Sequence, residues 1–176
     1  MDEFLLAELR KLKKACARRD IAALKDFGEE VAEKAFIDDN PQLLNVVVVA
    51  YAVAKFLEKP YIVNTPAWAK TLKELQEHVD ECIRSVKDGE EEECFELLGG
   101  MVGHLEKFSS QASRFRSTVV EKAKIKAATQ VYAHGASLST AAAFAKVEKE
   151  DLAAYIGATK LPEKYETISV KERLKA

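Results

Sequence analysis

The sequence of 176 residues predicts an all-α protein, in which a multi-helix bundle is followed by a smaller C-terminal unit of three helices. Three observations predict this class. Ala, Leu, Lys and Glu dominate the composition, as is typical of helical proteins. Apolar residues recur at steps of three and four, which places them on one side of a helix. The seven glycines and four prolines are concentrated at a few break points between these periodic segments.

Charge divides the chain into two parts. The whole sequence contains 27 basic and 29 acidic residues, so it has no strong overall field to attract nucleic acid. Residues 1–109 contain 15 basic and 22 acidic side chains, whereas residues 110–176 contain 12 basic and 7 acidic ones. We therefore predict an acidic helical bundle over 1–109 and a basic unit over 110–176, with the boundary in the serine-containing sequence "SSQASRFRST".

Two helices are expected in the first 40 residues. Over 2–19 the apolar residues form one helical stripe, which consists of Phe4, Leu5, Leu9, Leu12 and Cys16. Asp20 is a good N-cap for a second helix, which should continue to the sequence "DDNP". A single long helix through Arg19 is the alternative.

A third helix is expected from Pro41 to about Glu58. Proline suits the first helical turn, because its missing amide hydrogen has no partner to lose there. This segment is apolar nearly all round, which predicts a central, buried helix. Its "VVVV" sequence would also suit a strand, but no second strand is expected to pair with it. The apolar run 46–54 is too short to cross a bilayer and ends at Lys55, so we expect no membrane association.

The next segment predicts a linker and two more helices. "PYIVNTP" over 60–66 is typical of an extended linker, and Thr65 is available to cap a helix over 67–87. "DGEEEE" then predicts a turn and the acidic first turn of a fifth helix. That helix contains three glycines in "LLGGMVGHL", which lower its intrinsic stability. Close helix packing, a kink or a small-molecule contact would each explain these glycines.

No catalytic or metal-binding motif is present. The chain has no Walker-type loop, GxGxxG, HExxH or serine elbow, and no paired arginine and histidine of the kind that helical ribonuclease toxins use. The nearest candidate for a metal site consists of His78, Cys82, Cys94 and His104, but the spacing matches no compact zinc motif. We therefore predict a non-enzymatic protein without a cofactor or bound metal, with cysteines in the core.

The cysteine pattern also bears on location. Cys16, Cys82 and Cys94 are odd in number and irregularly spaced, and no cationic leader with a cleavage site precedes them. This pattern favours a reducing cytoplasm.

The C-terminal third predicts three helices. A long helix over 118–134 should turn Val119, Ala123, Ala127 and Val131 inward and its lysines to solvent. Gly135 can end this helix in a left-handed conformation, and Ser137 or Ser139 can cap the next one. The residues that should close a three-helix core follow in order: Leu138, Ala142, Phe144, Ala145, Val147, Leu152, Tyr155 and Ile156, with Gly157 at the end. In the tail, Ser169 and Glu172 form a capping box for a final short helix.

In these residues the chain resembles the homeodomain-like and resolvase-like helix-turn-helix families, over Val119 to Gly157. The resemblance implies that the helix starting near Glu148 enters the major groove of DNA. The chain departs from the family pattern at two places. Lys146 occupies a turn position where these families usually have glycine, and the helix that should contact bases begins with Glu148, Glu150 and Asp151, which repel phosphates.

The resulting expectation is a cytoplasmic nucleic-acid-binding protein of the transcription-regulator type, assembled as a homodimer. Residues 110–176 would form its helix-turn-helix unit. The candidate phosphate-binding residues are Arg114, Arg116, Lys122, Lys124, Lys126, Lys146 and Lys149. The alternative is a protein-protein interaction or adaptor protein that does not bind DNA, in which these side chains form ordinary solvated helix faces.

Overall fold

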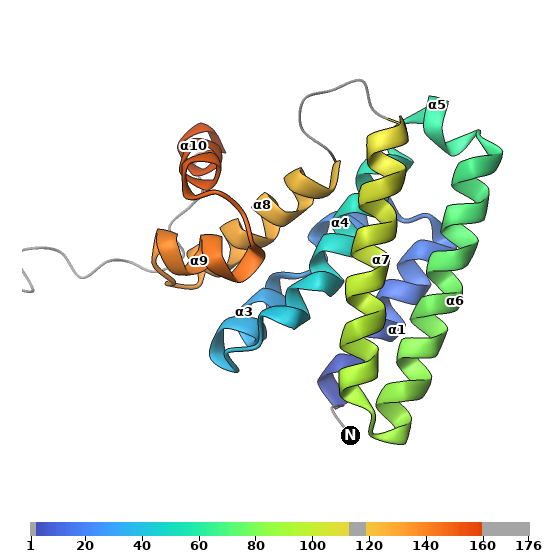
Figure 1. The fold of residues 1–176 in the computed structure, drawn as a ribbon, viewed down its shortest axis with the longest axis horizontal. Helices are drawn as coiled ribbons and strands as arrows, with labels where there is room; N and C mark the ends of the chain where they lie inside the picture. Colours follow the sequence, from blue (N-terminus) through green and yellow to red (C-terminus); the bar gives the residue numbers. More distant parts are fainter. Residues whose placement is uncertain (1–2, 113–118, 160–176) are drawn as a thin grey trace, which may run out of the picture.

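The computed structural model describes residues 3–112 and 119–159 of the chain (Figure 1). Every regular element in these two ranges is a helix, and they contain no strand. This confirms the prediction of an all-α, multi-helix bundle. Arg114, Arg116 and the final helix predicted from Ser169 onward lie outside the described residues.

The first two predicted helices are three in the structure: α1 (Glu3–Arg18), α2 (Ile21–Asp26) and α3 (Glu29–Ile37). Asp20 caps α2 as predicted, because its carboxylate accepts a hydrogen bond of 3.0 Å from the backbone N–H of Ala23. Arg19 has a φ of 52°, so the alternative of one continuous helix is wrong. The second predicted helix is interrupted between Asp26 and Glu29. Gly28 in this connection has a left-handed φ of 114° and is the N-cap of α3.

The central helix is α4 (Leu44–Leu57), which a short 3-10 helix, η1 (Pro41–Leu43), precedes. Ten of its 14 residues are buried, and it packs against α1, α2, α3, α7 and α8. The prediction of a buried central helix is confirmed, and the alternative of a strand is wrong. None of the described helices combines the length and apolar character that crossing a bilayer requires.

The remaining bundle helices are α5 (Pro60–Val63), α6 (Pro66–Asp88) and α7 (Glu91–Ala112). The extended linker predicted at 60–66 is wrong, because Pro60 starts a short helix there. Thr65 caps α6, as predicted, by accepting a hydrogen bond from the Trp68 N–H. The chain then reverses at Gly89, and α7 runs back along α6, which also packs against α1 (Figure 1).

Of the three glycines of α7, Gly100 and Gly103 are not required for close packing against another helix. The helix is continuous from Glu91 to Ala112. A Cβ atom built at Gly100 or Gly103 has no neighbour within 4 Å, and at Gly99 the nearest atom is the Asn45 Nδ2, at 3.9 Å. Gly99 and Gly103 instead line a small cleft, of about 290 Å³, beside α4 and α9.

Three helices complete the described chain: α8 (Val119–Ala133), α9 (Leu138–Ala145) and α10 (Lys149–Thr159). The four residues predicted to face inward from α8 are all buried. α8 packs against α3, α4 and α7 on one side and against α9 and α10 on the other. Gly157 does not end α10, which continues to Thr159.

The buried residues of α8, α9 and α10 belong to the same hydrophobic cluster as those of the bundle. α7 runs past residue 109 to Ala112, so the predicted boundary falls inside a helix. The division into units 1–109 and 110–176 remains a prediction.

Candidate nucleic-acid interface and the adjoining cleft

The connection between α9 and α10 is a tight turn of three residues. Ser137 caps α9 by accepting a hydrogen bond of 3.1 Å from the Thr140 N–H. Lys146 ends α9 in the left-handed conformation, with a φ of 54° and a ψ of 52°. The turn closes with a backbone hydrogen bond of 3.0 Å from the N–H of Val147 to the carbonyl of Ala142. The side chain of Lys146 is exposed. The left-handed conformation costs a residue with a Cβ atom roughly 1–2 kcal/mol, which glycine would avoid.

Leu152 anchors α10 to the other two helices. Its side chain is fully buried, and Val147 and Ile156 pack around the same core with part of their surface exposed. On the opposite side of α9, Phe144 meets Phe36 of α3 edge to face, with ring centroids 6.2 Å apart. α9 therefore contacts the bundle directly at α3, in addition to packing on α8.

The outer side of α10 carries few hydrogen-bonding groups. Its exposed residues include Glu150, Ala153, Ala154, Gly157 and Ala158. Alanine and glycine side chains cannot donate hydrogen bonds to base edges, and a carboxylate at the first turn repels phosphates. Of the exposed side chains of α10, Lys149 in the first turn is of the type that reads guanine, and none is of the type that commonly reads adenine.

The predicted lysines fall into two groups. Lys122, Lys124 and Lys146 line one cleft, whereas Lys126 and Lys149 lie outside it. Lys122, Lys146 and Lys149 are exposed, as expected. Lys124 and Lys126 were expected to face solvent but are only partly exposed.

Lys124 makes an ion pair across the edge of the cleft. Its Nζ lies 2.6 Å from Oε1 of Glu106 on α7, and its side chain is 26% exposed. The pairing uses the charge of Lys124 within the protein, so this lysine is less available to a phosphate than the sequence suggested.

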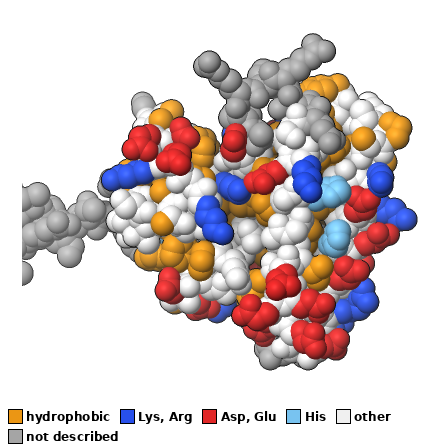
Figure 2. Space-filling model, viewed as in Figure 1, with side chains coloured by type: hydrophobic (Ala, Val, Ile, Leu, Met, Phe, Trp, Pro, Cys, Tyr) orange, Lys and Arg blue, Asp and Glu red, His pale blue; other side chains and the backbone are white. Residues whose placement is uncertain are grey.

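This cleft lies between α4, α8 and α10, with Glu106 of α7 at its edge, and has a volume of about 920 Å³. Figure 2 shows basic and acidic side chains interspersed over this part of the surface, and a concentration of carboxylates at the end of the bundle where α6 turns into α7. The described surface near α8 and α10 is thus mixed in charge.

Two bundle lysines that the sequence analysis did not select belong to this region. Lys55 of α4 lines the cleft. Lys59, between α4 and α5, is partly buried and makes no ion pair with a carboxylate in the described parts of the chain. Burial lowers the pKa of Lys59, and the nearby charges of Lys122 and Lys55 lower it further. No local pattern marks these lysines, because only the packing of α8 on α4 brings them near Lys122.

Two tyrosines form part of the cleft walls. Tyr51 comes from α4 and Tyr155 from α10, and both are partly buried. The Lys55 Nζ lies 5.5 Å from the centroid of the Tyr51 ring and 3.0 Å from Oε2 of Glu58. Burial raises the pKa of the Tyr155 hydroxyl, and the adjacent Tyr51 adds to this shift.

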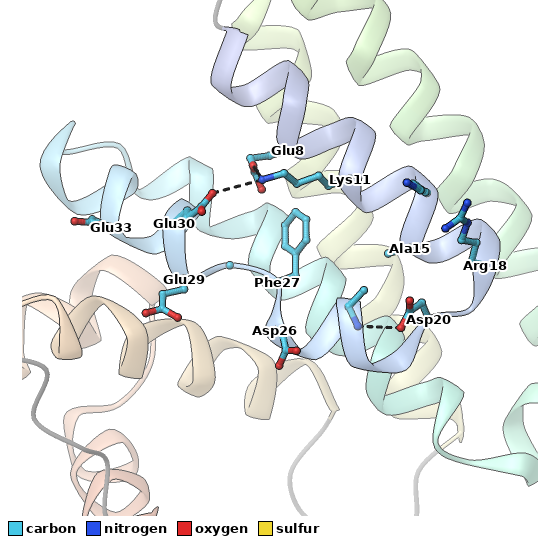
Figure 3. A pocket seen from close by; sticks show the side chains of 13 residues that line it. Glu8, Lys11, Ala15, Arg18, Asp20, Asp26, Phe27, Glu29, Glu30 and Glu33 are labelled. Carbon is cyan, nitrogen blue, oxygen red and sulfur yellow. Dashed lines mark hydrogen bonds and ion pairs between the residues drawn. The ribbon is translucent and has the colours of Figure 1, made fainter.

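A second cleft, of about 660 Å³, lies between α1, α2 and α3 (Figure 3). The Phe27 ring points into it, and Lys11 extends from Glu8 on one wall toward Glu30 on the other. The Lys11 Nζ is 2.6 Å from Oε1 of the buried Glu8. Six carboxylates and three cations line this cleft, so it is unsuited to binding phosphate.

Of the residues considered for a metal site, the structure brings the two cysteines of α6 and α7 together. Cys82 and Cys94 are buried between α6 and α7, where the Cys82 thiol lies 3.6 Å from the Cys94 carbonyl oxygen. The His104 Nε2 is 3.3 Å from Oε2 of Glu74. In the ranges 3–112 and 119–159, no three or more His, Cys, Asp or Glu side chains gather as metal ligands would. Cys16 is also buried, and burial raises the pKa of its thiol to about 12.

Comparisons of the chain with protein-family models, with curated proteins and with solved structures found no match.

Proposed function

We propose that the protein is a non-enzymatic nucleic-acid-binding protein of the transcription-regulator type, in which α8, α9 and α10 form a helix-turn-helix. The observation that carries the proposal is the arrangement of α10. This helix is held by the buried Leu152 behind a tight turn, while its opposite side is exposed along its length. In helix-turn-helix proteins, the second helix is exposed in the same way and enters the major groove of DNA.

Contacts with the DNA backbone would supply most of the affinity. Lys149 at the start of α10 and Lys126 on α8 are the lysines of the predicted set that lie outside the cleft. Arg114 and Arg116, outside the described residues, are further candidates from the sequence. Because the exposed side of α10 consists largely of alanine and glycine, with few side chains that can read bases, we expect weak sequence preference and strong dependence on salt.

A homodimer in the cytoplasm fits this proposal best. Two weakly binding units related by a two-fold axis would engage adjacent half-sites, so their contributions would combine. The buried, unpaired cysteines Cys16, Cys82 and Cys94 are compatible with a reducing compartment.

Duplex DNA binding measured over a range of salt concentrations tests the proposal. We expect the logarithm of the affinity to fall linearly with the logarithm of the salt concentration. Replacement of both Lys126 and Lys149 by alanine should reduce the slope by about two, since each phosphate contact contributes about one. The matched control is the double replacement of Lys70 and Lys73, which lie on α6 in exposed pairs with Glu74 and Glu77. Absence of binding at low salt would contradict the proposal.

The second candidate is an interaction or adaptor protein, and the outer side of α10 favours it. Exposed Ala153, Ala154, Gly157 and Ala158 form a surface of small residues on which another helix could pack closely. The variant Ala154→Arg separates the two candidates. It should block association with a protein partner by steric overlap, whereas it should strengthen DNA binding by adding a positive charge to the groove-facing side.

A further inference from the structure

We propose that the small cleft of about 290 Å³ between α4, α7 and α9 binds a monocarboxylate with an apolar body, such as a medium-chain fatty acid. The cleft combines a largely apolar lining, one positive charge that no carboxylate neutralises, and two glycines that leave its α7 side open. The inference concerns a small molecule and does not depend on DNA binding by α10.

The glycines of α7 leave room for a ligand on one side of the cleft. Gly99 and Gly103 are one helical turn apart, and both line it. A Cβ atom would make only an ordinary contact at Gly99 and would meet nothing within 4 Å at Gly103, so packing requires neither glycine. Glycine destabilises a helix interior relative to alanine. Of the explanations that the sequence allowed, a small-molecule contact agrees with the place of these two residues on the cleft.

The lining of the cleft is largely apolar, as is usual for small-molecule sites. The larger apolar side chains come from three helices and are Leu44, Val48, Val102 and Phe144. The volume of about 290 Å³ is close to the lower end of the usual range of roughly 300–1,000 Å³ and equals the space of about ten water molecules. A ligand of about ten non-hydrogen atoms, such as octanoate, is therefore the size that we expect.

The charges that line the cleft favour a ligand with a single negative charge. They belong to Glu106, Lys124 and Lys146. Lys124 and Glu106 neutralise each other, because the Lys124 Nζ lies 2.6 Å from the Glu106 Oε1. Lys146 makes no ion pair with any residue that the structure describes, so one positive charge remains for the ligand. A second negative charge on the ligand would meet the carboxylate of Glu106 without a further free cation among the lining residues.

Asn45 supplies a neutral hydrogen-bonding group to the same cleft. Its side chain lines the cleft, is partly buried and has no hydrogen-bond partner within the described ranges. The amide of Asn45 can donate a hydrogen bond to a carboxylate oxygen. A carboxylate thus finds a donor and a cation here, whereas a hydrocarbon would leave both unused.

Isothermal titration calorimetry of the full chain with octanoate, octan-1-ol and acetate tests the proposal. Octanoate should bind with a dissociation constant of about 0.1–1 mM, as is reasonable for a ligand of this size. Octan-1-ol should bind about threefold more weakly, because it lacks the charge that pairs with the exposed Lys146. Acetate should give no detectable heat at the same concentrations, because it lacks the apolar body.

Two leucine variants of neighbouring glycines test the location of the site. Gly99→Leu should abolish octanoate binding, because the Cβ atom added at Gly99 points toward Asn45 across the cleft and the longer side chain would fill it. The matched control is Gly100→Leu. Gly100 is the next residue of α7, does not line the cleft and has open space around its Cβ position. This control should change octanoate affinity less than about twofold, and circular dichroism should show both variants folded.

A third variant tests the charge without filling the cleft. Lys146→Asn removes the positive charge, and asparagine tolerates the left-handed conformation of this position. It should weaken octanoate binding about threefold and leave octan-1-ol binding unchanged.

Three results would overturn the proposal: no heat with millimolar octanoate, equal losses of octanoate affinity in Gly99→Leu and Gly100→Leu, or octan-1-ol binding as strong as octanoate binding. The DNA proposal is tested by Lys126 and Lys149, which do not line this cleft, so either proposal can fail alone.

Discussion

At the scale of single residues, the buried carboxylate of Glu8 depends on one partner. The Glu8 side chain is 5% exposed and is bound by Lys11, whose own side chain is 56% exposed. Burying a charge without a partner costs more than an exposed ion pair contributes. The stabilising effect of Lys11 is therefore mainly to pair with a neighbour that has little contact with water.

Lys11→Ala should lower the free energy of unfolding by about 1–2 kcal/mol, because Glu8 loses its partner. The hydrogen bond to Glu8 raises the pKa of Lys11 above its ordinary value of 10.5. The contribution of the pair is thus fully present below pH 10.5 and is lost as the pH rises through the raised value. Urea denaturation at pH 7 and above pH 11 measures the change. The control is Lys14→Ala on the same helix, and an equal effect of both variants would contradict the role of Glu8.

At the scale of elements, local signals predicted helix starts better than helix interruptions. Asp20, Thr65 and Ser137 accept capping hydrogen bonds as their positions in the sequence indicated. Such caps involve residues three positions apart, so the sequence contains the whole interaction. The break at Gly28 was not predicted. The close approach of Val47, which leaves no room for a Cβ at this position, joins residues far apart in the sequence.

Two glycine replacements should have opposite effects. Gly28→Ala should destabilise the protein by about 2–4 kcal/mol, because the residue has a positive φ and its new Cβ would lie 2.5 Å from Cγ1 of Val47. Gly100→Ala should stabilise it by about 0.5–1 kcal/mol, because alanine favours a helix and nothing lies within 4 Å of the new atom. Thermal unfolding followed by circular dichroism measures both. A loss of stability in Gly100→Ala would indicate a contact of α7 that the isolated chain does not make.

The candidate site was predictable only in part. The turn at Lys146 and the core position of Leu152 follow from residue types at fixed spacings within one short segment. The grouping of Lys122 with Lys55 and Lys59, and the pairing of Lys124 with Glu106, arise from the packing of α8 against α4 and α7. Charge counted along the sequence could not show which lysines are already paired within the fold.

At the scale of the whole molecule, α8 determines whether the chain behaves as one unit. It lies between the bundle and the last two helices, and its buried residues contact both sides. The Phe36–Phe144 contact adds a second connection between α3 and α9. Helices that share a hydrophobic core in this way usually unfold together, whereas linked domains with separate cores unfold separately.

We therefore expect one cooperative unfolding transition, although the charge pattern suggested two units. Trp68, the single tryptophan, lies fully buried in the bundle beside Phe56 and Phe108, so its fluorescence reports on the bundle. Circular dichroism reports on all helices, and the two transitions should coincide in urea. Val131→Ala should shift both by the same amount, because Val131 is fully buried in α8. Loss of α8–α10 helicity before the tryptophan signal changes would instead establish the division near residue 109.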